Sequence, residues 1–160
     1  MKKNLTHFTK SGEAHMVDIK NKNITDRIAV ASGKIFMSKD SIKKIKEGNH
    51  KKGDVLGIAR IAAITASKKA SDLIPLCHNI NLSSVTVDFK INLSKKYVFC
   101  KAEVKTSGKT GVEMEALTSV QIGLLTIYDM CKAIDKSMII SEIQLESKKG
   151  GASGEWNRGK

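Results

Sequence analysis

The sequence is poor in cysteine, aromatic residues and proline, and it has no long hydrophobic run. Its three cysteines, Cys77, Cys100 and Cys131, lie far apart and include no C-x-x-C pair. This spacing argues against a disulfide framework and against a metal site of the zinc type. No stretch reaches 18 apolar residues, and the first ten residues contain no apolar segment of the signal-peptide kind. We therefore expect a soluble, cytoplasmic protein without membrane contacts.

Acidic residues and arginine are also scarce. The chain has 16 acidic and 28 basic residues, a net charge of +12, and only three of the basic residues are arginine. This charge favours an anionic partner such as a nucleotide, a nucleic acid, a membrane surface or an acidic protein. Nucleic-acid readers, however, rely on arginine forks or on stacked aromatic rings, and only seven aromatic residues are present. A lysine-rich, solvated surface would explain much of the excess of basic residues without any binding partner.

The length of 160 residues and the apolar content of 41% are those of one globular domain over residues 1–160. We expect residues 1–12 and 148–160 to be flexible, because the first segment is polar and the second begins with a glycine-rich stretch.

Hydrophobic spacing predicts the elements of this domain. They are, in order, a strand at 14–19, a bent strand or hairpin at 24–37, helices at 38–46 and 54–70, a loop at 73–78, strands at 82–93 and 97–106, a long buried helix at 112–134 and a strand at 138–145. Ser38 and Asp54 are the expected N-caps of the first two helices. This order is the split βαβ pattern of a ferredoxin-like α+β fold, an antiparallel sheet packed with helices, with an N-terminal strand extension.

The long predicted helix carries four charged residues in a mostly apolar segment. Glu115 and Asp129 are 14 residues apart, which brings them to within about 40° around the helix axis. Asp129 and Lys132 are neighbours at i and i+3. Two interpretations stay open: Asp129 and Lys132 form a surface ion pair while Glu113 and Glu115 complement the helix dipole, or the acids face a pocket or a protein interface.

Three other short segments carry polar side chains suited to chemistry. The run Gly108–Gly111 (G-K-T-G) lacks the full spacing of a P-loop, but its glycines permit a tight turn that can approach a ligand. Cys77 and His78 follow the only proline, and Lys51 and Lys52 precede a helix N-terminus, where anions bind favourably. Packing or solvated roles remain the alternative for each. Together these groups suit proton transfers on a polyanionic substrate.

Five motifs stand in one order along the chain: G-E-A-H-M-V-D (12–18), H-K-K-G-D-V (50–55), D-L-I-P-L-C-H (72–78), G-K-T-G-V-E-M-E-A-L-T (108–118) and L-T-I-Y-D-M-C-K-A (125–133). Together they resemble the cyclic pyranopterin monophosphate synthase family, the molybdenum cofactor biosynthesis protein C family. The resemblance covers residues 4–154. One departure is Asn79, which stands where the family pattern has proline after L-C-H.

The resemblance implies a specific reaction and assembly. The substrate is 3′,8-cyclo-7,8-dihydro-GTP, which a radical-SAM GTP cyclase supplies, and the products are cyclic pyranopterin monophosphate and pyrophosphate. The enzyme is then a phosphorus–oxygen lyase that uses general acid–base catalysis. It requires no cofactor and has no metal site of its own, although Mg²⁺ can accompany the triphosphate. The family fold is ferredoxin-like, and its subunits form a hexamer, a trimer of dimers, with active sites at subunit interfaces.

The resemblance also assigns residues by their motifs. The catalytic residues are Asp129, Lys52 and Lys132, of which we expect Asp129 and Lys132 to act as a coupled acid–base pair. Desolvation at an interface would lower the pKa of Lys132, and Asp129 would oppose that shift. The substrate-binding residues are Leu76, Cys77, His78, Glu113, Met114, Glu115, Arg27 and Lys148. We expect the two glutamates to accept hydrogen bonds from the guanine-derived amine and ring N–H groups, and His78, Arg27 and Lys148 to hold the triphosphate.

Two other classes of function remain open. Ferredoxin-like folds also host RNA-binding modules, which the net charge of +12 would suit. The predicted hairpin carries only Phe89, Tyr97 and Phe99, which is few for such a surface. A non-catalytic oligomeric scaffold is the third interpretation. It predicts that Asp129→Asn leaves function intact.

Overall fold

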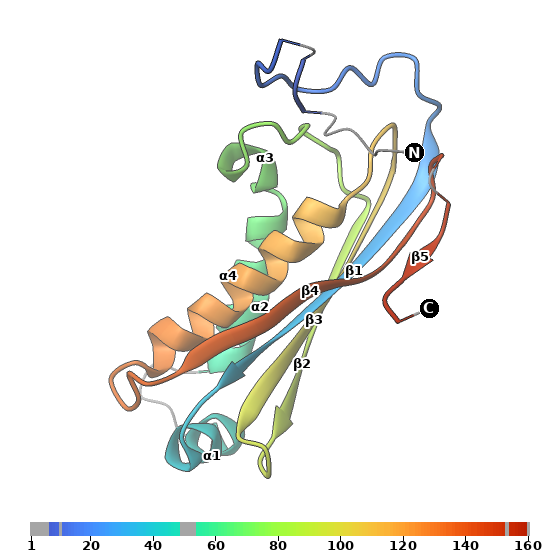
Figure 1. Ribbon diagram of the computed structural model, residues 1–160. Coiled ribbons are helices and arrows are strands. Elements are labelled where there is room, and N and C mark those ends of the chain that lie inside the picture. The colour runs from blue at the N-terminus through green and yellow to red at the C-terminus, as the bar shows by residue number, and fades with distance from the viewer. Residues whose placement is uncertain (1–6, 10, 49–53, 153, 160) are drawn as a thin grey trace.

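The computed structural model describes residues 7–9, 11–48, 54–152 and 154–159 and has the expected ferredoxin-like α+β fold (Figure 1). The elements are β1 (Thr25–Phe36), α1 (Lys39–Glu47), α2 (Val55–Ser67), α3 (Ala70–Leu73), β2 (Ser84–Asn92), β3 (Tyr97–Gly108), α4 (Glu113–Cys131), β4 (Ile139–Lys149) and β5 (Trp156–Asn157). The sheet has the order β2-β3-β1-β4-β5, and all its neighbouring strands are antiparallel. The predicted split βαβ pattern is thus confirmed.

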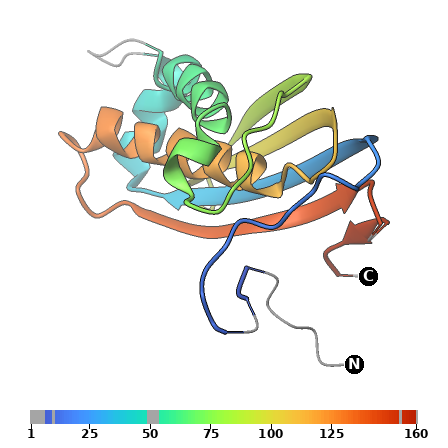
Figure 2. The ribbon, with the colours of Figure 1, turned by 90° about the horizontal axis from the view of Figure 1, so that it is seen from above.

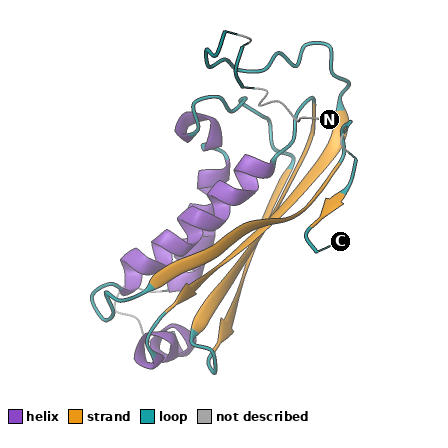
Figure 3. Cartoon of the chain, viewed as in Figure 1, coloured by secondary structure: helices purple, strands orange, loops and turns teal. Residues whose placement is uncertain are grey.

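Helices α2 and α4 lie side by side on one face of the sheet and run in opposite directions (Figures 2 and 3). The core lies between this helical layer and the sheet and consists mainly of alternating strand residues and small or branched helix residues. Helix α4 comes close to the sheet at Gly33 in β1, where an added Cβ atom would stand 2.9 Å from side-chain atoms of Val120 and Leu124. Glycine at this position therefore lets α4 pack directly on the middle of the sheet.

The predicted N-caps of the first two helices, Ser38 and Asp54, are confirmed. The Ser38 hydroxyl accepts the Ser41 N–H at 3.2 Å and caps α1, and the Asp54 carboxylate accepts the Gly57 N–H at 2.9 Å and caps α2. Each cap satisfies a backbone donor that has no partner within the helix. Helix α2 ends at Ser67, a little before the predicted end, and the separate short helix α3 follows it.

The predicted strand at 14–19 is wrong. This segment is irregular apart from one isolated bridge between Phe8 and Ala14. Met16 is exposed, and Val17 and Ile19 are only half-buried, so the segment has no apolar face to lay against the core. Its short apolar pattern therefore does not lead to a paired strand.

The last long strand extends beyond the predicted range. Strand β4 continues past Leu145 to Lys149, with Lys148 paired to Ala29 and Lys149 paired to Ile28. The register of β4 against β1 shifts between Leu145 and Ser147, so that Glu146 is an extra residue, a β-bulge. The bulge breaks the alternation of apolar and polar residues on which the prediction relied.

A buried carboxylate fastens the α4–β4 connection to the start of α1. Asp135 accepts hydrogen bonds from the Ser38 N–H at 2.7 Å, the Ser137 N–H at 2.9 Å and the Ser137 hydroxyl at 2.6 Å. The pKa of this carboxyl is lowered, chiefly by the Ser137 hydroxyl and the Ser38 N–H. The ionised form therefore stabilises the fold.

We expect Asp135→Asn to lower the free energy of unfolding by about 1–3 kcal/mol at pH 7, because the amide nitrogen would face a buried N–H donor. Since the folded-state pKa lies below the unfolded value of about 3.9, the wild-type advantage should be complete above that pH and shrink as the pH falls through the folded-state pKa. Urea unfolding at a fixed protein concentration, at pH 7 and at pH 3.5, tests this. A difference between the proteins that does not shrink at acid pH would contradict it.

Candidate active site

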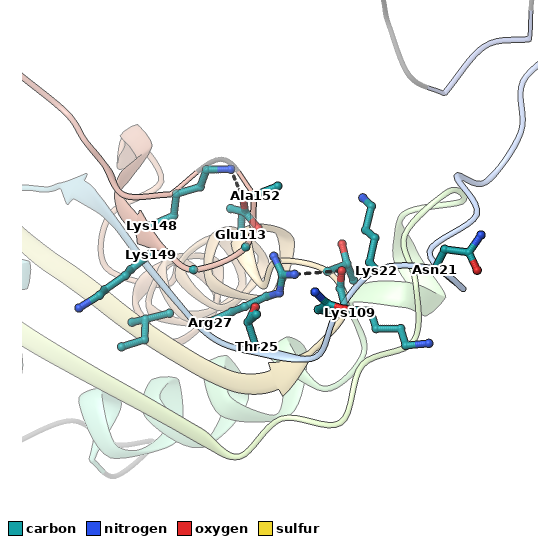
Figure 4. Close-up of a pocket in the computed structure, with 15 residues that line it drawn as sticks. Asn21, Lys22, Thr25, Arg27, Lys109, Glu113, Lys148, Lys149 and Ala152 are labelled. Carbon is teal, nitrogen blue, oxygen red and sulfur yellow. Dashed lines mark hydrogen bonds and ion pairs between the residues drawn. The ribbon is translucent and has the colours of Figure 1, made fainter.

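A basic cleft with a volume of about 710 Å³ lies at the end of the sheet where α4 begins (Figure 4). Among the described residues, its charged lining consists of one carboxylate, Glu113, and five cationic side chains, those of Lys22, Arg27, Lys109, Lys148 and Lys149. They come from the segment before β1, from β1 itself, from the β3–α4 turn and from the end of β4. Such an excess of positive charge in a concave surface attracts anions.

Arg27 is held in the cleft by backbone carbonyls of the β3–α4 turn. Its Nε donates to the Gly108 oxygen at 2.9 Å and its Nη2 donates to the Lys109 oxygen at 3.1 Å. The backbone of Gly151, whose φ is +75°, lies against the other side of the guanidinium. A Cβ atom there would stand 2.1 Å from Arg27 Nη1. The fork is therefore fixed in position before any ligand binds.

Gly151→Ala should displace the Arg27 guanidinium and weaken the binding of inorganic pyrophosphate, a probe of this cleft, about tenfold, the effect of one charge-assisted hydrogen bond. Gly154→Ala is the matched control, because Gly154 also has a positive φ, +65°, but no atom lies within 4 Å of its would-be Cβ. Both variants carry the same backbone strain. Isothermal titration calorimetry compares them, and equal pyrophosphate affinities in the two variants would contradict the prediction.

Lys148 and Glu113 point toward each other across the cleft (Figure 4) and form an ion pair of 2.9 Å. Lys148 lies in β4, and Glu113 is the first residue of α4. Their side chains are 31% and 22% exposed, so the pair is partly shielded from water. Two residues that the sequence predicted as substrate-binding, 35 positions apart, are thus in direct contact.

Glu115 follows Glu113 by two residues in the first turn of α4 and is buried, with 3% of its surface exposed. The Cys77 thiol is 3.8 Å from its Oε1 atom, while no donor among the described residues reaches Oε2. Burial raises the pKa of the Glu115 carboxyl, the hydrogen bond from the residue's own backbone N–H and then the Cys77 thiol oppose this shift, and the charge of Glu113 adds to it. Burial, followed by the Glu115 charge, raises the pKa of Cys77 to about 11. A neutral thiol therefore faces a desolvated carboxyl group.

His78 holds the N-terminal segment rather than lining the described part of the cleft. Its Nε2 lies 2.7 Å from the Val17 oxygen, and the Lys109 ammonium donates to the Lys20 oxygen, also at 2.7 Å. These two bonds secure the segment whose residues 21–23 line the cleft. Among the other predicted binding residues, Leu76 is half-buried and Met114 is exposed.

The predicted pair of Asp129 and Lys132 stands at the opposite end of α4. The two side chains form an i,i+3 ion pair of 2.7 Å and are 61% and 54% exposed. The 14 residues between Glu115 and Asp129 place this pair about 21 Å along the helix from Glu115. The pKa of Lys132 is raised, first by the hydrogen bond to Asp129. The lowering expected at an interface is not seen in the single chain, where the ammonium group is solvated.

Lys52, the third predicted catalytic residue, lies outside the described residues. The first described residue after it, Asp54, caps α2. Because α2 and α4 run in opposite directions, the start of α2 lies at the same end of the helical layer as the end of α4 (Figure 1). That end also carries the Asp129–Lys132 pair.

Sequence reasoning missed several residues of the cleft. Lys22 is one lysine in a polar segment, and no pattern in the sequence marks it. The pair Gly150–Gly151 was interpreted only as part of a glycine-rich stretch, although both residues have positive φ and lie close to β1. Lys109 was noted in its G-K-T-G turn, and the structure shows what this turn does, since its carbonyls orient Arg27.

Comparison with models of protein families gives a match to the MoaC family over residues 16–151. The matched range is well over half of the chain and includes β1, β4 and all elements between them. It also contains the charged residues described for the cleft, the Cys77–Glu115 contact and the Asp129–Lys132 pair. The resemblance inferred from the five motifs is therefore confirmed.

Proposed function

Because the chain belongs to the MoaC family, an enzyme family of molybdenum cofactor biosynthesis, we propose that it is a cyclic pyranopterin monophosphate synthase. In this proposal it converts 3′,8-cyclo-7,8-dihydro-GTP to cyclic pyranopterin monophosphate and pyrophosphate, as a phosphorus–oxygen lyase. The substrate comes from a radical-SAM GTP cyclase, and both enzymes work in the cytoplasm.

The observation that carries this proposal is the pairing of a cationic cleft with two carboxylates at the start of α4. A nucleoside triphosphate has the same division, a polyanionic tail beside a ring with N–H donors. Arg27 and Lys148 would bind phosphate oxygens through charge-assisted hydrogen bonds. Glu113 and Glu115 would accept hydrogen bonds from the guanine-derived amine and ring N–H groups. His78 would support the phosphates, with Leu76, Cys77 and Met114 beside the substrate.

The chemistry needs further proton transfer, which we assign to Asp129, Lys132 and Lys52. The reduced imidazole part of the substrate opens, a pterin ring forms, and a sugar hydroxyl attacks the innermost phosphate and expels pyrophosphate. Each stage moves protons. An aspartate–lysine pair can accept and return them, and it would titrate as a unit.

This assignment requires a second copy of the chain, since one copy holds the two groups about 21 Å apart along α4. Met114 and Leu125 are exposed on α4, and Ile58 and Ile61 are exposed on α2, so the helical layer presents apolar side chains to solvent. An antiparallel two-fold pair of these layers would cover them and set the end of one α4 against the start of the other. We propose such a dimer as the unit of a homohexamer, a trimer of dimers.

We propose that the protein requires no cofactor of its own for this reaction and that any Mg²⁺ enters with the triphosphate. The part of the chain that the structure describes has no group of three or more His, Cys, Asp or Glu side chains that could hold a metal ion. The same residues include no helix long and apolar enough to cross a membrane.

The decisive test is incubation of the purified protein with 3′,8-cyclo-7,8-dihydro-GTP, followed by measurement of pyrophosphate and of product mass. We expect turnover by the wild type and none by Asp129→Asn. Full activity of Lys132→Arg would refute proton transfer by Lys132, since arginine does not deprotonate. A folded wild-type oligomer without turnover would refute the proposed function. Salt-dependent RNA binding would then be the next measurement.

A further inference from the structure

Glu115 presents a buried carboxylate oxygen that has no donor. The residue is 3% exposed, and Oε2 has no hydrogen-bond partner among the described residues. A buried carboxylate without full pairing is costly, so such a group in a native fold points to a ligand that completes it. The position of Glu115, beside Glu113 and the cleft, makes the substrate of the proposed reaction the natural ligand.

The other oxygen of Glu115 faces Cys77, and the backbone fixes the position of that thiol. The Cys77 N–H donates to the Ile74 oxygen at 3.0 Å, in the turn after α3. From there Sγ reaches Glu115 Oε1 at 3.8 Å, and the His78 oxygen lies at 3.7 Å from the same sulfur. The thiol can donate to either of these two acceptors. The described residues offer it no other acceptor.

Charge and protonation favour donation from the thiol to the carboxylate. The raised pKa of Cys77, about 11, keeps the thiol protonated at neutral pH. Among the described residues, Glu113 on the same helix is the other charged group that acts on Glu115, and the ring of His78, next to Cys77 in the chain, is engaged by Val17. Neither supplies a proton to Oε1 among the described contacts.

We propose that Cys77 is a positioning residue whose thiol binds Oε1 of Glu115 and so presents Oε2 to an N–H donor of the substrate. This deepens the proposed function and rests on it. The ligand chemistry is that of an amino or amide N–H pair on a heterocycle, which a fixed carboxylate can accept from. Cys77 itself takes no part in bond making or breaking.

The test compares Cys77→Ala, which removes the donor, with Cys77→Ser, which keeps one. In protein labelled with ¹³C at glutamate carboxyl carbons and without substrate, the Glu115 signal, identified by its loss in Glu115→Gln, is titrated. The thiol lowers the pKa of Glu115, so Cys77→Ala should raise that pKa. Cys77→Ser should return it toward the wild-type value. Identical titrations in all three proteins would overturn the proposal.

The catalytic readout is the pH profile of kcat/KM. In Cys77→Ala the acid limb should move to higher pH, with activity recovering above it, whereas Cys77→Ser should keep the wild-type limb. A simple packing role would lower activity equally at all pH values and would not be rescued by serine. If the wild type shows no turnover, the proposed function fails, while the substrate-free titration still decides whether Cys77 acts on Glu115.

Discussion

Oligomers mixed from Asp129→Asn subunits and Glu115→Gln subunits should recover activity that neither variant has alone. Within one chain these carboxylates are at opposite ends of α4, about 21 Å apart along the helix. If the active site combines the start of one α4 with the end of another, a mixed dimer has one site with both substitutions and one site with neither. Random mixing gives mixed dimers in half of the cases, so about a quarter of the sites should be intact.

The reason for expecting so large a gain is the two-fold relation itself. In a two-fold interface, the start of each α4 faces the end of the partner's α4, so every dimer has two composite sites, and each site takes one carboxylate from each subunit. The exposed side chains of Met114 and Leu125 lie on α4 between these ends, and burying them would help hold the two helices together.

The experiment denatures the two variants together, refolds them and measures pyrophosphate release. The matched control mixes Asp129→Asn with Lys132→Ala, two substitutions at the same end of α4. In that mixture every site of a mixed dimer keeps one substituted residue, so no activity should return. Recovery in the control would show that Asp129 and Lys132 do not act in the same site, and no recovery in the first mixture despite confirmed subunit exchange would show that the site lies within single subunits. Either result would contradict the proposed composite site.

Much of the fold could be predicted from local signals. The alternation of Val85, Val87 and Phe89 identified β2, because a half-buried strand repeats every two residues. Ser38 and Asp54 marked the starts of α1 and α2, because capping depends on residues only three positions away. Strand alternation and helix caps depend on residues that are close together in the sequence, so they can be predicted without knowledge of the tertiary structure.

The arrangement of the site depends on contacts that short segments do not encode. Lys148 meets Glu113 only because β4 pairs with β1 beside the start of α4, and the bulge at Glu146 shifts which face Lys148 occupies. Glu115 is buried by a loop that lies 38 residues earlier in the chain. Acids in the first turn of a helix usually remain solvated and complement the helix dipole. The sequence position of Glu115 therefore favoured a solvated carboxylate, whereas the structure buries it.

The separation of Asp129 from Glu115 illustrates a different limit. Helical periodicity gives the angle between two residues around the axis, and on that measure they seemed close. It also gives their distance along the axis, about 21 Å, which only the structure shows to be unbridged within one subunit. The resemblance to the family, by contrast, assigned both groups to one site, which in our proposal is assembled from two chains.

Arg27→Ala should lower kcat/KM by about a hundredfold or more, because two charge-assisted hydrogen bonds to the triphosphate are lost. Arg27 is the only arginine among the residues that line the cleft, and its fork is fixed by the Gly108 and Lys109 carbonyls. Arg27→Lys should restore little of the loss, since an ammonium group has no planar fork. The measurement is initial-rate kinetics with the cyclised nucleotide, together with calorimetric binding of pyrophosphate.

The chain offers a close control in Arg60. Its Nε also donates to a backbone carbonyl at 2.9 Å, that of Val87, but it lies on α2, away from the cleft. Arg60→Ala removes the same kind of side chain and one hydrogen bond of the same kind, and only Arg27→Ala should lose pyrophosphate affinity. Equal losses of activity in the two variants would mean that the effect comes from the fold. A loss confined to Arg27→Ala would tie the fixed guanidinium of β1 to the phosphates of the substrate.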